Sequence, residues 1–258
     1  MDAFEQSFSQ TTKILFGKEL PDFYAYSGWL SEHVPLPYPA KSKKSGKEAW
    51  MPPPRDFLGK KFSAKNIVSM DEGEMNKENS YTFEDIKNAG LDSIRKKYVA
   101  PVAIYFGNFR YKTYQNDQKS SGTGDCVNVY MVEDVYHVTK NVAFCKSILY
   151  SENMFGCREG THSKYCIKCY GSVDLTRCFE MDSCTKCSDS YFCHNCEGLL
   201  ECMFCFNVKA KRYAIGNVEV GKEKYMKIKK MVLDEIANKL EKEKKLDINI
   251  FNIGSKKL

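Results

Sequence analysis

Cysteine is the residue type whose spacing in this chain points most directly to chemistry. Ten of the twelve cysteines lie between residues 157 and 205. Eight of these ten form C-x2-C pairs, and the pairs are Cys166/Cys169, Cys184/Cys187, Cys193/Cys196 and Cys202/Cys205. Two such pairs separated by fourteen residues, as in 166–187 and 184–205, approach the spacing of a zinc ribbon, in which four thiolates hold Zn²⁺ at about 2.3 Å. The eight paired cysteines are therefore candidate metal ligands.

The same cysteines also recur with a period of nine. Written in nines, the segment gives one column of Cys157, Cys166, Leu175, Cys184, Cys193 and Cys202, and a second of Gly160, Cys169, Cys178, Cys187, Cys196 and Cys205. A fixed period is typical of repeat architectures. Because nine is a poor multiple of 3.6 and the segment is rich in Tyr, Phe and Ser, we expect strands. Two nines would form one eighteen-residue coil of a two-sided β-solenoid, whose like residues stack about 4.8 Å apart.

Three states of the cysteines are compatible with this pattern. Neutral thiols are small and easily buried, so they suit a packed ladder inside a narrow solenoid. Thiolates of stacked coils would instead hold zinc, and oxidised thiols would form disulfides. We favour the packed ladder without a cofactor, because the unpaired Cys157 and Cys178 belong to the same columns. Zinc is the alternative, and a reducing compartment makes disulfides the exception.

Part of the repeat resembles a known family. The motifs that carry the resemblance are Cys-Thr-Lys-Cys-Ser-Asp-Ser-Tyr-Phe from Cys184, Cys-Met-Phe-Cys-Phe-Asn from Cys202, and Lys-Arg-Tyr-Ala-Ile-Gly-Asn from Lys211. They are similar to an uncharacterised family of cysteine-repeat proteins from small-genome bacteria and from environmental and viral sequences. The resemblance covers about residues 157–230 and supports the fold more than any activity. Many members carry an N-terminal zinc ribbon, whereas this chain has no cysteine before Cys126.

The N-terminal half contains expected helices and a basic segment. The apolar spacing of residues 4–16 predicts a short helix, and an aromatic stretch follows it. The basic, proline-bearing segment 41–65 is expected to form an extended arm that contacts phosphate or an acidic partner, through Lys41, Lys43, Lys44, Lys47, Arg55, Lys60 and Lys61. A second helix is expected over 81–98, with Thr82 as its cap and a buried stripe of Phe83, Ile86, Leu91 and Ile94. A strand over 99–109 and a flexible Gly- and Ser-rich connector over 115–125 follow.

From Cys126 the apolar residues alternate with a period of two, which predicts that the solenoid begins there. A helix is expected from about residue 222 to 244, because apolar residues recur there at intervals of three or four: Tyr225, Ile228, Val232, Ile236 and Leu240. This amphipathic helix would cap the last coil, or its apolar stripe would instead serve oligomerisation. Alternating apolar residues over 246–250 predict a terminal strand that docks on another surface.

The predicted fold class is mainly β with flanking helices, a short Cys-ladder β-solenoid (a parallel β-helix or roll) capped by the C-terminal helix. We expect the chain to divide into four segments: 1–66 with the N-terminal helix and basic arm, 67–124 with a small α/β segment and linker, 125–218 with the solenoid, and 219–258 with the C-terminal helix and strand. No apolar run approaches the roughly 18 residues that cross a bilayer, and the first residues lack the basic-then-apolar pattern of a signal sequence. We therefore expect a cytoplasmic or virion location and no membrane partner.

Three function classes are compatible with the sequence. The favoured one is a non-enzymatic structural or assembly protein that docks through its terminal segments in a larger complex, such as a virus or phage particle, with protein partners or copies of itself. The second is a zinc-dependent nucleic-acid-binding module, which the net charge of +6 supports. The third is a thiol redox or Fe–S protein. We expect no enzyme and no small-molecule substrate, because the histidines are scattered and the C-x2-C pairs are expected in strands rather than at helix starts.

Overall fold

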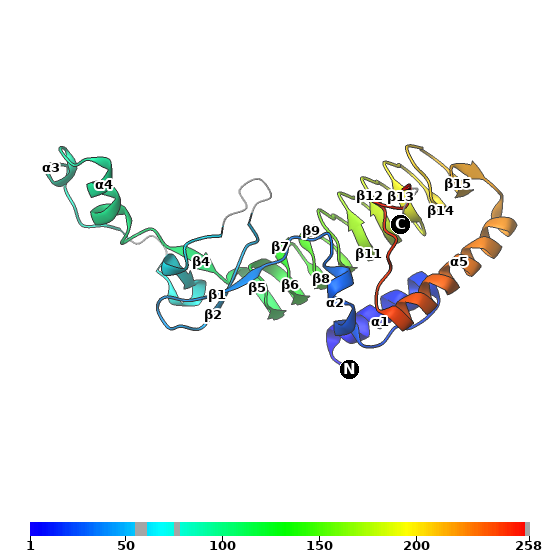
Figure 1. Ribbon diagram of the computed structural model, residues 1–258, viewed down its shortest axis with the longest axis horizontal. Coiled ribbons are helices and arrows are strands. Elements are labelled where there is room, and N and C mark those ends of the chain that lie inside the picture. Colours follow the sequence, from blue (N-terminus) through cyan, green and yellow to red (C-terminus); the bar gives the residue numbers. More distant parts are fainter. Residues whose placement is uncertain (55–60, 75–77, 256–258) are drawn as a thin grey trace.

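The computed structural model describes residues 1–54, 61–74 and 78–255. Its main body is a β-solenoid of about nine coils flanked by an N-terminal and a C-terminal helix, which confirms the predicted fold class (Figure 1). Parallel strands build the coils: β5 (Phe109–Gln118), β6 (Gly122–Tyr130), β7 (Glu133–Tyr136), β8 (Thr139–Ala143), β9 (Lys146–Leu149), β10 (Glu152–Phe155), β11 (Lys164–Tyr170), β12 (Thr176–Asp182), β13 (Tyr191–His194), β14 (Leu200–Met203) and β15 (Arg212–Ile215).

Each regular coil contains twelve residues, not the expected eighteen. The strand register pairs Met154 with Cys166 and Cys166 with Cys178, and each partner lies twelve positions further along the chain. The underlying unit has three residues, because every third residue points inward, as Cys166, Cys169 and Ser172 do. Nine and twelve are both multiples of three. Cysteines at inward positions can therefore recur at nine although the coil closes after twelve.

The residue before each inward position adopts a left-handed backbone conformation, and this conformation turns a corner. Lys168 (φ 52°), Gly171 (φ 51°) and Asp174 (φ 55°) are consecutive examples. Asn and Asp tolerate positive φ better than other non-glycine residues. They occupy many of these corners, namely Asp125, Asn128, Asp134, Asn141, Asn153, Asp174, Asp189, Asn195 and Asn207. One corner every three residues gives the coil four sides.

The solenoid starts earlier than the expected residue 125. Residues 109–130 form β5 and β6, so the expected flexible connector over 115–125 is wrong. The expected alternation with a period of two is also wrong, because the residues that enter the interior cluster here are Cys126, Val129, Val132 and Val135, with a spacing of three. The small Gly and Ser residues near 120 suit tightly wound coils rather than a linker.

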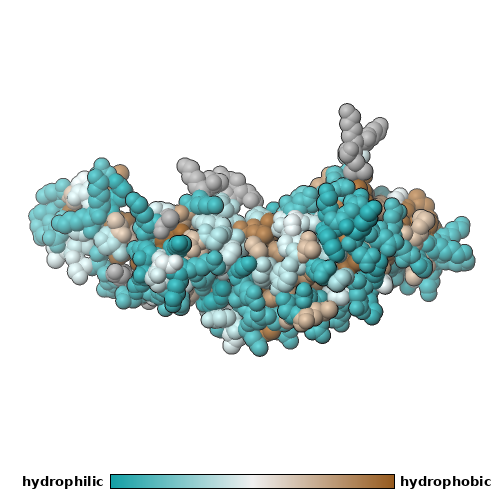
Figure 2. Space-filling model, turned by 60° about the horizontal axis from the view of Figure 1, so that its bottom comes forward, coloured by the Kyte–Doolittle hydropathy of each residue, from teal (hydrophilic) through white to brown (hydrophobic). Residues whose placement is uncertain are grey.

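Helices cover one side of the solenoid. They are α1 (Ala3–Phe16), the short turns η1 (Phe23–Tyr26) and α2 (Ser27–Leu30), and α5 (Lys222–Glu243). Phe8 meets Phe155 at 5.3 Å between ring centroids, and Phe16 meets Phe179 at 5.0 Å, both edge to face. The helix expected over residues 4–16 is confirmed. The aromatic N-terminal segment therefore packs on the chain's own solenoid, and mostly hydrophilic side chains cover the outer faces of these helices (Figure 2).

The C-terminal helix matches its expected range; it begins beside the last coil and runs back along the side of the solenoid to α1 (Figure 1). Tyr225 in its first turn is fully buried and lies 5.8 Å from Tyr213 of β15. The two-residue strand β16 (Val218–Glu219) pairs antiparallel with β15, and the Asn217 amide bonds to both the N–H and the C=O of Phe206, at 2.8 and 2.9 Å. Residues 246–250 form no strand. They dock on the solenoid as an irregular segment in which Leu246 and Ile250 are buried.

A small module precedes the solenoid. Strands β1 (Tyr38–Lys41) and β2 (Glu48–Met51) form an antiparallel hairpin, so the expected extended arm is folded here. The short turns η2 (Ala64–Asn66) and η3 (Met70–Glu72) flank β3 (Ile67–Ser69), which pairs with β4 (Tyr105–Gly107). Only residues 105–107 of the strand expected over 99–109 belong to β4, and Phe109 already starts β5.

The helix expected over 81–98 is broken into three short pieces. They are α3 (Phe83–Ile86), α4 (Leu91–Ile94) and the π-helical turn η4 (Arg95–Val99), and together they project from the left end of the molecule in Figure 1. Thr82 caps α3 through contacts with Asp85, as expected. Gly90 starts a new helix instead of continuing the old one. The expected buried stripe is wrong, because Phe83 is 72% and Leu91 83% exposed.

Candidate functional site

The cysteines line the interior in four columns, one for each side of the coil. The first column contains Cys145, Cys157, Cys169, Met181, Cys193 and Cys205; the second Cys166, Cys178, Ser190 and Cys202; the third Ser172, Cys184 and Cys196; and the fourth Ser163, Leu175, Cys187 and Leu199. All twelve thiols of the chain are free and buried. The columns are therefore a packed ladder of thiols, hydroxyls and aliphatic side chains.

The candidate zinc arrays do not come together. The four cysteines of the array 166–187 occupy four different columns, and so do those of the array 184–205. Every cysteine belongs to the described part of the chain, and within that part no group of three or more Cys, His, Asp or Glu residues is arranged to hold a metal ion. The twelve-residue coil explains this, because the fourteen-residue gap places the second pair on the opposite sides.

Thiols and hydroxyls play the same role inside the coils. The Cys157 Sγ accepts the N–H of Cys169 at 3.4 Å, and the Ser163 Oγ accepts the N–H of Leu175 at 3.1 Å. Each side chain also donates to the carbonyl two residues earlier, as Cys157 does to Phe155 at 3.4 Å. A buried N–H without a partner is costly. Cysteine and serine therefore satisfy inward-facing backbone groups that an aliphatic side chain would leave open.

Burial and thiol–thiol hydrogen bonds shift the pKa values of the ladder. Burial raises the pKa of Cys178 and of Cys193 well above the usual range, because the thiolate is disfavoured in an apolar interior. The Cys184 thiol bonds to Cys187 and Cys196, which lowers the pKa of Cys187 and brings that of Cys196 to about 7. Cys196 is still only 4% exposed. The thiols therefore donate their protons to one another and to backbone carbonyls, and all of them are buried away from solvent.

Five of the seven basic candidate residues belong to the described part of the chain. Lys41, Lys43, Lys44 and Lys47 are exposed along the β1–β2 hairpin and its turn. Among them lies the acidic Glu72, whose backbone carbonyl accepts the Lys44 Nζ at 2.5 Å. Lys61 is exposed and stands over the Tyr38 ring at 4.7 Å. Arg55 and Lys60 lie outside the described residues.

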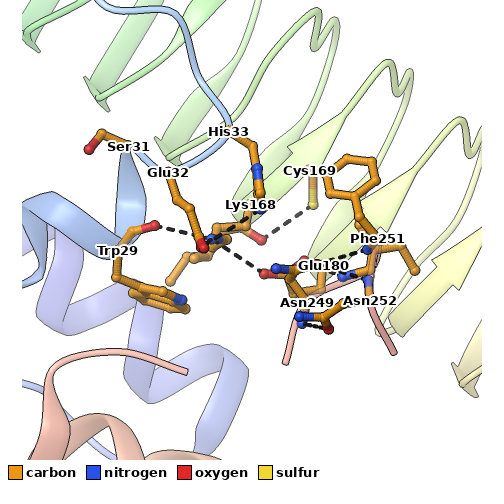
Figure 3. A network of polar contacts seen from close by, with 12 residues as sticks. Trp29, Ser31, Glu32, His33, Lys168, Cys169, Glu180, Asn249, Phe251 and Asn252 are labelled. Carbon is orange, nitrogen blue, oxygen red and sulfur yellow. Dashed lines mark hydrogen bonds and ion pairs between the residues drawn. The ribbon is translucent and has the colours of Figure 1, made fainter. Parts of the chain in front are cut away.

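A buried ionic cluster, which the nine-residue period conceals, joins the terminal segments to the solenoid (Figure 3). The Lys168 Nζ lies 3.0 Å from the Glu32 carboxylate, 3.1 Å from the Trp29 carbonyl and 3.7 Å from Glu180. Glu180 accepts the N–H of Ile250 at 2.9 Å through its other oxygen. Lys168 and Glu180 have no solvent exposure. One site therefore fastens the N-terminal segment, the coils and the C-terminal segment together.

The signal for this cluster was present but depended on the coil length. Lys168 and Glu180 are twelve residues apart and occupy the same corner of adjacent coils, a relation that a period of nine conceals. Burial raises the pKa of Glu180 to about 8, although Lys168 opposes the shift. Burial and the nearby Lys168 ammonium lower the pKa of His33. At neutral pH, Glu32 is thus the main counter-charge of Lys168, and the arrangement is structural.

Comparison of the chain with protein-family models, with curated proteins and with solved structures found no match. Among the described residues, no helix combines the length and the apolar character needed to cross a membrane.

Proposed function

We propose that this chain is a non-enzymatic structural protein that joins a larger protein assembly through its projecting arm, residues 78–104. The observation that carries the proposal is the exposure of this arm's apolar side chains. Phe83, Leu91, Tyr81 and Val99 are 72%, 83%, 46% and 45% exposed. The apolar terminal segments, which first suggested docking, pack on the solenoid and leave this role to the arm.

The arm is built to gain order from a partner. Helix α3 has four residues, and α4 continues into η4 over only nine residues, 91–99, so both are shorter than the roughly 12–15 residues at which isolated helices become stable. Tyr98 alone of its large side chains is buried, against Tyr81 at 5.0 Å and the Asp85 carbonyl at 3.0 Å. Contact with an apolar groove would bury Phe83 and Leu91 and stabilise both turns.

Charge favours a protein as the partner. The helical part of the arm contains four basic and three acidic residues: Lys87, Arg95, Lys96 and Lys97 against Glu84, Asp85 and Asp92. Two of the acidic side chains already pair within the arm, Glu84 with Lys87 and Asp92 with Arg95. A nucleic acid would meet little excess positive charge here.

The test compares the mass of native complexes. The wild-type chain, tagged in its natural host, should elute well above its own 29.6 kDa. Phe83→Ser combined with Leu91→Ser should elute as a monomer with unchanged thermal unfolding. Met231→Ser, which removes a 62% exposed apolar side chain from α5, is the matched control and should not change the elution. A wild-type chain that stays monomeric both in the extract and at micromolar concentration would refute the proposal.

A second candidate function is nucleic-acid binding through the hairpin lysines. Its support is the exposure of Lys41, Lys43, Lys44 and Lys47 on one hairpin. Affinity for a single-stranded oligonucleotide should then fall steeply with salt, and Lys43→Ala with Lys44→Ala should flatten that dependence. Lys230→Ala on α5 is the control. An affinity that does not change with salt concentration would exclude this function. Binding that requires zinc would favour a zinc-dependent nucleic-acid-binding module.

A further inference from the structure

A cleft of about 620 Å³ lies where the N-terminal module meets the first coil. The module contributes Lys47, Glu48, Trp50 and Asp71, and the coil contributes Arg110, Tyr114, Asp117 and Lys119. Small-molecule sites occupy roughly 300–1,000 Å³ and are frequent at such junctions between structural units. The size and place of the cleft therefore suit a ligand.

The floor of this cleft is the polar end of the solenoid core. Arg110 and Asp117 pair in register with the inward-facing Thr123 and Val129 of the next coil, so they occupy core positions. Their side chains form an ion pair at 2.8 Å and are 17% and 1% exposed. Arg110 also donates to the carbonyls of Phe109 and Ser120, at 2.9 and 3.2 Å. Charged residues at an edge oppose strand addition, so stacking of a second solenoid on this end is disfavoured.

The floor also retains unused hydrogen-bonding capacity. Asp117 Oδ2 receives Arg110 and the Thr123 hydroxyl, whereas Asp117 Oδ1 is buried and has no hydrogen-bond partner among the described residues. Buried carboxylate oxygens in folded proteins are normally bonded to protein or water. A hydroxyl or an ordered water that enters the cleft would supply the missing donor.

Two aromatic side chains line the cleft above this floor. The Asn108 carboxamide holds the backbone N–H of Trp50 at 2.8 Å, and Glu48 holds its indole N–H at 2.7 Å. The Tyr114 ring is 53% exposed and lies 5.8 Å from the Arg110 guanidinium. Both rings are amphipathic, with an apolar face and a polar edge. The fixed indole and the open phenol give a ligand apolar surface to lie on.

The charges around the cleft balance. Three cationic residues, Lys47, Arg110 and Lys119, stand against three carboxylates, Glu48, Asp71 and Asp117. An anion or a cation would therefore gain no net electrostatic attraction, while a ligand with both donors and acceptors would find partners of both kinds. Apolar ring faces together with many hydroxyls are the properties of a sugar.

We propose that this cleft binds a neutral saccharide. Sugar faces lie against both Trp50 and Tyr114, and the sugar hydroxyls bond to Asp71, Lys47 and Lys119 at the rim. The polar floor excludes a purely apolar ligand, because the Arg110–Asp117 pair would lose contact with water without compensation. This site is independent of the projecting arm and of the assembly function proposed for it.

The chain's two tryptophans allow a direct test. Trp29 is 6% exposed and remote from the cleft, so a saccharide should quench or shift the emission of Trp50 alone. The full chain is titrated with neutral hexasaccharides of the cello, xylo, malto and N-acetyl-chito series, and with a polygalacturonate fragment as the charged comparison. At least one neutral sugar should saturate the change with a Kd below about 1 mM.

Calorimetry with matched variants locates the site. Trp50→Ala and Tyr114→Ala should each weaken binding at least about tenfold, a change of about 1.4 kcal/mol. Tyr111→Ala is the control, because Tyr111 is also 53% exposed on β5 and does not line the cleft. Unchanged thermal unfolding of each variant shows that the module stays folded. No binding of any neutral sugar, binding of the charged fragment alone, or equal affinity of Tyr114→Ala and the wild type would overturn the proposal.

Discussion

The Lys168 ammonium lies 3.7 Å from the Glu180 carboxyl, and both side chains are completely buried at one corner of adjacent coils. Glu32 supplies the second carboxylate and is 44% exposed. Because burial raises the pKa of Glu180 to about 8, Glu180 holds a proton at neutral pH and the pair carries one net positive charge, which Glu32 balances. The protonation state of this one glutamic acid therefore sets the net charge of the cluster that joins both terminal segments to the coils.

This relationship predicts a pH-dependent stability. Between its usual pKa of 4.5 and about 8, Glu180 binds a proton in the folded chain that it has lost in the unfolded chain. The free energy of unfolding should therefore fall as pH rises through this range, by at most about 1.4 kcal/mol per pH unit from this group. Glu180→Gln removes this contribution. In urea unfolding at pH 5, 6, 7, 8 and 9, the unfolding free energy of the variant relative to that of the wild type should increase with pH until about pH 8.

The control for this prediction is Glu223→Gln, because Glu223 is 86% exposed on α5. Its unfolding free energy should follow that of the wild type across the same range. Parallel curves for Glu180→Gln and the wild type would mean that Glu180 ionises normally in the folded chain, and the assignment of Glu32 as the main counter-charge would fail.

The exchange of thiols and hydroxyls inside the coils gives a second prediction. Cys157→Ser keeps an acceptor for the N–H of Cys169, whereas Cys157→Ala leaves that buried N–H open. The alanine variant should lose about 1–3 kcal/mol and the serine variant clearly less. The reciprocal pair is Ser163→Ala and Ser163→Cys, judged on the N–H of Leu175. Thermal unfolding of all four variants measures these differences in stability. Equal losses of stability for Cys157→Ser and Cys157→Ala would show that packing alone, and not the hydrogen bond, favours cysteine at this position.

The cysteine spacing was sufficient to predict the fold class but not the coil. The nine-residue recurrence is a poor multiple of 3.6 and so indicated strands, and the small, easily buried thiols indicated a narrow solenoid interior. The register needed the spacing between hydrogen-bonded partners, and Leu175, Met181 and Ser190 interrupt the cysteines at inward positions. The nine-residue recurrence reflects which inward positions happen to hold cysteine. The twelve-residue coil is set by the backbone.

The terminal segments could not be placed from the sequence for a different reason. Their apolar residues were recognised, but their partners are an outward column of the coils, including Phe155, Phe179 and Tyr191. Such a column is visible only once the coil length is known. The arm shows the reverse case. Phe83 and Leu91 have helical spacing, yet the break at Gly90 and the absence of a neighbouring surface within the described chain leave both exposed.

The asparagine ladder along one corner of the solenoid gives a third prediction. Asn128 donates to Asn141 at 2.9 Å, and Asn141 donates to Asn153 at 3.0 Å, each from a corner with positive φ. Asn141→Ala loses the ladder bonds and puts a Cβ without a compensating hydrogen bond at φ 53°. Asn141→Gly loses only the bonds. The alanine variant should therefore be less stable than the glycine variant by about 1 kcal/mol.

The matched site for this prediction is Asn195, which has φ 50° and one ladder bond, to Asn207 at 2.8 Å. Its Ala and Gly variants should differ by the same amount from each other, but both should lose less than the variants at 141. Chemical unfolding measures all four. A glycine variant at 141 as stable as the wild type would show that the ladder contributes nothing beyond backbone geometry.

The last prediction concerns the state of the thiols in solution, because a packed ladder and a metal site make opposite demands on the same sulfurs. Cys178 belongs to no C-x2-C pair, and Cys187 belongs to both candidate zinc arrays, yet both are fully buried. In a ladder, Cys178→Ala and Cys187→Ala each remove one small group and should cost about 1–2 kcal/mol. Their melting temperatures should fall by similar amounts, and a chelator should change neither.

Zinc would produce a different pattern in the same experiment. A tetrathiolate site contributes about 10 kcal/mol or more to folding, so Cys187→Ala would collapse while Cys178→Ala stayed nearly stable. The measurement therefore pairs melting curves, with and without chelator, with elemental analysis and a thiol count on anaerobically purified protein. Twelve titratable thiols after denaturation, no bound metal and matched losses support the ladder. Selective loss at Cys187 with bound zinc would show that metal draws these four columns together in a way that the twelve-residue coil does not provide.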